Sequence, residues 1–113
     1  MKNFFMITAV SVLSVTTAFA ETAPGSVSFE DGSVIASLTG VAGDAAAGRN
    51  TFKNRKQGNC LACHMNDDMP NEQFHGEVGP PLSGVGDRWE DAELRGIVTN
   101  AKMMFEGTIM LAF

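Results

Sequence analysis

The sequence predicts an all-α fold built as one small domain. Two segments have helical side-chain patterns, one at residues 45–56 and one that begins near residue 87. No long segment alternates apolar with polar residues, so nothing in the sequence predicts a β-sheet. The length of 113 residues suits a single domain.

The first 20 residues have the order of a secretory signal peptide. Lys2 gives a positive start, and residues 4–15 are mostly apolar but too short for a stable membrane anchor. The residues Ala18-Phe19-Ala20 form an A-x-A cleavage signal. We expect cleavage after Ala20, a periplasmic location, and a mature chain of 93 of the 113 residues without a membrane span.

The predicted mature chain is small and acidic. The full chain has a formal net charge of −5, and loss of Lys2 with the signal peptide makes it −6. That sign disfavours a nucleic-acid partner. A hydrophobic core of this size gives marginal stability without a covalent cross-link or a cofactor. Cysteine pairs of exported proteins rarely stay free.

The remaining chain divides into an extension at residues 21–43 and a domain at residues 44–113. The extension is rich in Gly, Ser, Thr and Ala, which predicts loose coil with one short strand or helical turn. Asp44 is a good N-cap for a helix over residues 45–56 that ends at Gly58. Residues 65–86 read as a loop because Gly, Pro and Asn interrupt them.

The second helix is predicted within "DRWEDAELRGIVTNAK". Asp87 and Glu90 have the spacing of a capping box. An apolar stripe at positions i, i+3, i+4 and i+7 consists of Leu94, Ile97, Val98 and Ala101.

The stretch "KQGNCLACHMN" holds both cysteines of the chain and one of its two histidines. A structural zinc site needs four ligands, and beyond Cys60, Cys63 and His64 only His75 is a strong nitrogen or sulfur ligand. A thioredoxin-like dithiol needs a preceding strand, which the sequence lacks. C-x-x-C-H is the motif of covalent haem c attachment, and we favour it over a bare disulfide or dithiol.

The helix before this motif carries Arg49, Lys53 and Lys56 at spacings that place them on one face. Such a face is usually solvated, and the alternative is a docking patch beside a redox centre.

Several segments resemble known proteins. "GDAAAGRNTF", "CLACH" and "GPPLSGVG" resemble class I cytochromes c. "NRKQGNCLACH", "GEVGPPLSGVGDRWEDAELRGIV" and "GTIM" are similar to SoxX, the monohaem cytochrome subunit of the Sox sulfur-oxidation system. The resemblance runs over about residues 37–113 and implies a helical class I cytochrome c-like fold around one covalent haem.

The resemblance implies a role for each matching residue. Cys60 and Cys63 would bind haem c covalently, and His64 would be the proximal iron ligand. Pro80 would offer its carbonyl to the other nitrogen of His64. Arg88 is similar to an arginine that neutralises a haem propionate. Pocket or core residues would be Leu82, Trp89, Leu94 and Val98, with Gly48 and Phe52 packing against the last helix of the fold.

A second axial ligand is expected for an electron-transfer haem, and methionine opposite histidine raises its potential. Met65 and Met69 follow His64 too closely, whereas Met103, Met104 and Met110 are far enough along the chain. The resemblance selects Met110, in "GTIM". Ligation by His75 is the alternative.

Two departures from the SoxX pattern stand out. Leu111 takes the place of the usual proline, and the sequence stops at Phe113, before the C-terminal helix of the family. We therefore expect a C-terminally incomplete cytochrome domain.

SoxX pairs with SoxA, and the pair joins thiosulfate oxidatively to a cysteine of the carrier SoxY–SoxZ. The resemblance therefore implies an electron-transfer subunit that has no substrate site of its own. It would meet the carrier and an electron acceptor only transiently. The alternative function is a free periplasmic cytochrome c that shuttles electrons.

Overall fold

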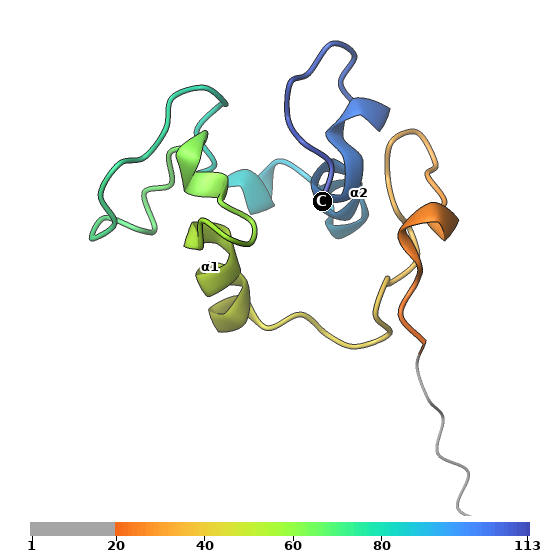
Figure 1. Cartoon of the computed structure of the whole chain (residues 1–113). Coiled ribbons are helices and arrows are strands. Elements are labelled where there is room, and N and C mark those ends of the chain that lie inside the picture. Colours follow the sequence, from red (N-terminus) through yellow and green to blue (C-terminus); the bar gives the residue numbers. More distant parts are fainter. Residues whose placement is uncertain (1–19) are drawn as a thin grey trace, which may run out of the picture.

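The structure is a computed structural model that describes residues 20–113, so the predicted signal peptide lies outside the described residues apart from Ala20. The elements in chain order are η1 (Pro24–Ser26), α1 (Ala45–Lys53), η2 (Cys60–Ala62), η3 (Val85–Asp87), α2 (Asp91–Asn100) and η4 (Ala101–Met103) (Figure 1). In this part of the chain, the only β-type pairing is an isolated bridge between Glu30 and Ser33. The predicted all-α fold is confirmed. Among the same residues, no helix is long and apolar enough to span a membrane.

Helix α1 begins as predicted and ends earlier than predicted. The Asp44 carboxylate accepts hydrogen bonds from the N–H groups of Ala46 and Ala47, at 2.8 and 2.9 Å. The helix ends at Lys53 because Asn54 is extended (φ −75°, ψ 118°) and the N–H of Gly58 turns back to the carbonyl of Thr51 at 3.1 Å. Lys56 therefore lies beyond the helix, and the predicted face of three basic residues is wrong.

Helix α2 begins three residues later than the predicted capping box would place it. The Glu93 carboxylate accepts a hydrogen bond from the N–H of Glu90 at 2.7 Å, so Glu90 is the N-cap. Asp87 belongs instead to η3, and its predicted capping role is wrong. Asp87/Glu90 and Glu90/Glu93 both have the spacing of a capping box. Which pair caps the helix depends on where the chain turns, and local spacing does not determine that.

The predicted apolar stripe of α2 is only partly buried. Ala101, just after the helix, is 1% exposed, and Leu94 and Ile97 are half-buried. Val98 is 55% exposed, so it is not a core residue, and its alternative role in a haem pocket stays a prediction. The buried residue of α2 is instead Gly96, where another part of the chain crosses the helix.

That crossing segment is the N-terminal extension, which docks on α2. The N–H of Val34 donates to the carbonyl of Ala92 at 2.9 Å. The guanidinium of Arg95 donates to the carbonyls of Val34 and Ile35, each at 3.0 Å. Val34 is 2% exposed, the only large side chain that is fully buried among the described residues. The extension has the predicted turn and coil, but it is part of the core rather than a loose leader.

The crossing predicts a strong effect of adding one methyl group at Gly96. A Cβ there would lie 1.9 Å from the carbonyl oxygen of Gly32. We expect Gly96→Ala to lift the extension and to lower the free energy of unfolding by about 2–3 kcal/mol. The control is Gly43→Ala, since Gly43 has open space around it. Chemical denaturation measures both variants, and equal stability would show that the extension does not pack on α2 in solution.

The core is small. Among residues 20–113, the buried apolar side chains are Val34, Leu61, Met69 and Ala101. Trp89 and Phe105 make an edge-to-face contact with ring centroids 5.6 Å apart, which joins the entry of α2 to the C-terminal segment. Figure 1 shows α1 and the cysteine-containing turn on one side, and α2 with the extension on the other.

Candidate functional site

The cysteine-containing turn (residues 59–64) follows α1 directly. Asn59 takes a left-handed conformation (φ 52°) and starts η2. The carbonyl of Cys60 then accepts hydrogen bonds from the N–H groups of Cys63 and His64, at 3.1 and 3.0 Å. One tight turn therefore holds two thiols and an imidazole. Both thiols are free, so the structure has no disulfide between them.

The ring of His64 is fixed by the chain 16 residues further on. Its Nδ1 lies 2.8 Å from the carbonyl oxygen of Pro80. A carbonyl can only accept, so Nδ1 carries the proton and donates it. Nε2 then keeps its lone pair, which is the state that a metal-bound histidine needs. The geometry expected of Pro80 is present.

Two glycines allow the Pro80 segment to lie against the turn, and sequence reasoning gave them no role. A Cβ on Gly79 would lie 2.3–2.8 Å from three ring atoms of His64. A Cβ on Gly76 would lie 2.1 Å from the carbonyl oxygen of Ala62. Backbone bonds from Gly76 to Leu61 (2.7 Å) and from Gly79 to the carbonyl of Cys63 (2.8 Å) hold this close approach. The two glycines in "HGEVGPP" were the sequence feature that could have indicated this close approach.

Arg88 braces the same segment. Its guanidinium donates to the carbonyls of Ser83 and Pro81, at 2.8 and 3.3 Å. The side chain is therefore tied to the loop that carries Pro80. Its predicted contact with a haem propionate stays a prediction.

His75 has no nitrogen free for a metal. Its Nδ1 accepts from the N–H of Asn66 at 3.1 Å, and its Nε2 lies 3.1 Å from the carbonyl oxygen of Met69, to which it can only donate. This arrangement uses both ring nitrogens to brace the loop after His64. It disfavours His75 as the second axial ligand.

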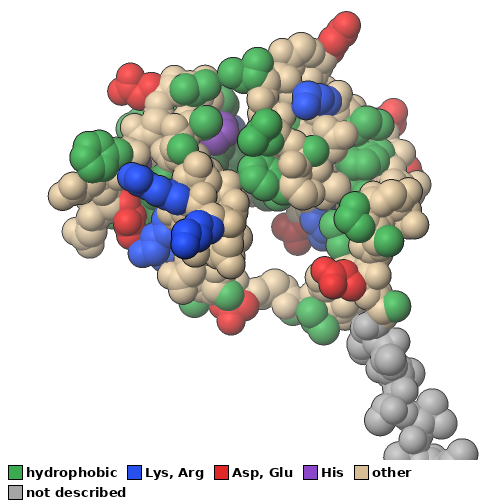
Figure 2. Space-filling view, in the orientation of Figure 1, with side chains coloured by type: hydrophobic (Ala, Val, Ile, Leu, Met, Phe, Trp, Pro, Cys, Tyr) green, Lys and Arg blue, Asp and Glu red, His purple; other side chains and the backbone are tan. Residues whose placement is uncertain are grey.

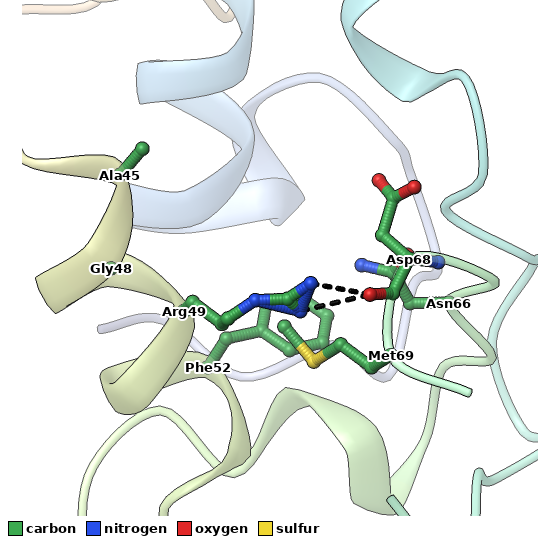
Figure 3. Close-up of a pocket in the computed structure, with 7 residues that line it drawn as sticks. All are labelled: Ala45, Gly48, Arg49, Phe52, Asn66, Asp68 and Met69. Atoms are coloured by element: carbon green, nitrogen blue, oxygen red, sulfur yellow. Dashed lines mark hydrogen bonds between the residues drawn. The ribbon is translucent and has the colours of Figure 1, made fainter. Parts of the chain in front are cut away.

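Met69 fills a groove beside α1 (Figure 3). It is 6% exposed, and the groove of about 390 Å³ is also lined by Gly48 and Phe52. This burial is that of a methionine that fills space in a core. A Cβ on Gly48 would meet nothing within 4 Å, so this part of the groove is open.

Two of the three basic residues proposed as a docking patch are engaged within the chain. Both terminal nitrogens of Arg49 donate to the carbonyl oxygen of Asp68, one of them at 2.9 Å (Figure 3). Lys53 forms an ion pair with Glu72 at 2.6 Å. These contacts hold the loop of Met69 against α1. The docking patch predicted for this helix is therefore not supported.

The three methionines that could reach the far side of an iron lie in or near the C-terminal coil. Met103 is 51% exposed, whereas Met104 and Met110 are half-buried. Met104 packs against Gly32, since a Cβ there would lie 2.8 Å from the Cβ of Met104. Met110 follows Gly107, which turns the chain with φ 77°, and its N–H donates to the hydroxyl of Thr108 at 3.3 Å.

The chain is similar to a solved structure and matches a family model. The chain is similar to the crystal structure of SoxXA from P. pantotrophus, with 51% sequence identity and a TM-score of 0.82. The match covers 83% of this chain and 69% of that chain. A family model described as cytochrome c matches residues 45–110. The chain belongs to the cytochrome c family. It is a SoxX-type cytochrome, although no curated protein matches the chain.

The cytochrome carries covalent haem c with its iron, and the donor set fits this group. The fit rests on two free thiols in one turn, and on an imidazole whose Nε2 lone pair is kept by the bond to Pro80. No group of three or more His, Cys, Asp or Glu side chains that could hold a metal ion by themselves occurs within residues 20–113. Figure 2 shows one histidine side chain between the two halves of the molecule, beside hydrophobic side chains.

The two thiols of the cytochrome differ in environment. Burial raises the pKa of the Cys60 thiol above its ordinary value, and the nearby Cys63 adds to the rise. A hydrogen bond with the backbone of Cys60 itself acts in the opposite direction. A raised pKa means less thiolate at neutral pH, so burial lowers the reactivity of the Cys60 thiol.

Proposed function

We propose that this cytochrome is the electron-removing subunit of a complex with a SoxA-type cytochrome, in the oxidative coupling of thiosulfate to a cysteine of a SoxY–SoxZ-type carrier. The observation that carries the proposal is the 51% identity to SoxXA with a TM-score of 0.82. The proposed role needs no substrate-binding residue in this chain. The chain accepts an electron from its partner and passes it on.

We propose a separate role for each residue of the site. Cys60 and Cys63 would hold the haem through thioether bonds, and His64 would bind its iron through Nε2. Pro80 fixes the orientation of the His64 ring through the 2.8 Å contact. Met110 would supply the second ligand to the iron, and Arg88 would neutralise a propionate. Bound haem c supplies reversible one-electron chemistry, whose potential depends on the axial ligands and their surroundings.

We further propose that residues 1–20 are a signal peptide, residues 21–43 an extension and residues 44–113 the cytochrome domain. The mature protein would then act in the periplasm. Support comes from the charged, apolar and A-x-A order of residues 2–20, and from the family match over residues 45–110.

Co-purification with a SoxA-type partner tests the function. The haem-loaded chain is mixed with that partner, and thiosulfate-dependent reduction of the haem is followed in the presence of the SoxY–SoxZ-type carrier. We expect a one-to-one complex and reduction that needs both cytochromes. Absence of a complex at micromolar concentration, with full activity of the partner alone, would favour a free electron shuttle.

Met110 is tested by spectroscopy. If its sulfur binds the iron, the oxidised protein has the weak near-infrared band of methionine-to-iron ligation, and Met110→Ala removes it. Met103→Ala is the matched control, because Met103 is half-exposed on the same segment. Loss of the band in the control, with the band retained in Met110→Ala, would assign the ligand to Met103.

A further inference from the structure

One loop next to the cysteine-containing turn has an exposed aromatic residue in a strained backbone. Phe74 is 81% exposed, the highest value among the large hydrophobic side chains of the described residues. Its φ of 64° lies in the left-handed region, which a bulky side chain rarely adopts. Two unfavourable features meet at one residue, and strain of this kind clusters at functional sites.

The loop around Phe74 is otherwise firmly held. His75 uses both ring nitrogens for bonds to the backbone at Asn66 and Met69. Gly76 donates to the carbonyl of Leu61 at 2.7 Å. The exposure of Phe74 is therefore a fixed property of the loop and not the result of a loose segment.

The loop that exposes Phe74 lies against the haem-attachment turn. A Cβ on Gly76 would lie 2.7 Å from the Cα of Cys63, so the chain two residues after Phe74 touches the haem-attachment turn. On the other side of Gly76, Val78 is 64% exposed. Exposed apolar side chains thus stand two residues before and two residues after the glycine that touches the attachment turn.

The same loop is acidic. Residues 65–79 contain no Lys or Arg, and their acids are Asp67, Asp68, Glu72 and Glu77. Glu72 is paired with Lys53, whereas the other three side chains are exposed. An apolar centre with a charged rim is the usual anatomy of a recognition surface. Negative charge on this rim selects a partner with a basic surface.

We propose that Phe74 and Val78, with the carboxylates of Asp67, Asp68 and Glu77, form a docking surface for a basic redox protein that accepts electrons from this cytochrome. The proposal rests on the electron-transfer role proposed above. The docked partner would lie beside the attachment turn, which Gly76 touches, and this position shortens the path for the electron. The contact is small and charged, as is typical of transient electron-transfer encounters.

The apolar part is tested with the haem-loaded chain and mitochondrial cytochrome c, a basic redox protein, as the probe. Phe74→Asn with Val78→Asn removes the apolar centre, and asparagine tolerates the left-handed backbone. The matched control is Ile35→Asn with Val41→Asn, at exposed positions on the extension. Stopped-flow mixing should show electron transfer about tenfold slower for the loop variant and nearly unchanged for the control.

The charged part is tested by ionic strength. Asp67→Asn, Asp68→Asn and Glu77→Gln together remove three charges from the loop. Glu21→Gln, Asp31→Asn and Glu106→Gln remove three elsewhere. The loop variant should react about tenfold more slowly at low salt, with a flatter salt dependence than the control. Equal rates and equal slopes in the two variants would overturn the proposal.

Two further measurements, oxidation by a small reagent and binding of the SoxA-type partner, distinguish loss of docking from other effects of the substitutions. Oxidation by p-benzoquinone, a small neutral reagent, should be the same in all variants. If it slows in step with the protein reaction, the loop acts on the haem site and the docking proposal is overturned. Loss of the SoxA-type partner from the loop variants would assign the surface to the permanent interface, which also overturns it. A chain without haem would instead refute the electron-transfer role itself.

Discussion

Gly79→Ala is expected to abolish the normal haem spectrum of this cytochrome. The added Cβ would lie 2.3–2.8 Å from Cε1, Nδ1 and Nε2 of His64, so the ring or the backbone must move. Movement of either one breaks the 2.8 Å contact between His64 and Pro80, which holds the imidazole in its iron-binding tautomer. We expect a shifted absorption spectrum and a loss of about 1–3 kcal/mol in the free energy of unfolding.

The control for this change is Gly86→Ala. Gly86 lies in the nearby turn η3, and a Cβ there would meet nothing within 4 Å. Its spectrum and stability should match those of the unchanged protein. An unaltered spectrum for Gly79→Ala would show that the His64 ring does not lie against Gly79 in the haem-loaded protein.

Removal of the haem is expected to abolish cooperative unfolding. The described part of the chain buries only four apolar side chains, which is too little to offset the conformational entropy of a domain of this size. Cys60→Ala with Cys63→Ala should therefore give a chain that melts without a sharp transition. Circular dichroism during heating, beside the haem-loaded protein, measures this.

Unchanged chain produced without haem maturation is the control for the thiols themselves. It should melt as broadly as the double variant, because both lack the haem. A sharp transition at the temperature of the haem-loaded protein would show that residues 20–113 fold without the cofactor.

The local features of this cytochrome were predictable from its sequence. The cysteine motif has a fixed spacing, and Asp44 caps α1 through bonds to residues two and three positions away. The fold class followed from two helices and the absence of alternating segments. The Pro80 contact was expected only through the resemblance to a known family.

Features that depend on distant segments were missed. The burial of Val34 requires a bond to Ala92, and nothing in the Gly- and Ser-rich extension indicates that partner. Lys53 was assigned to a free surface because Glu72 is 19 residues away in the sequence. The end of α1 was misplaced by three residues, because Asn54 and Gly58 stop the helix through backbone geometry rather than side-chain pattern.

The docking of the N-terminal extension on α2 has a consequence for the order of folding. Arg95 and Val34 are 61 positions apart, so their contact closes a long loop of chain. Closing a loop of that length costs about 4 kcal/mol of chain entropy, beyond a constant for any closure. Contacts so distant in sequence form late, after local turns and helices. The haem-attachment turn, whose bonds are local, can therefore form before the extension closes over the far helix.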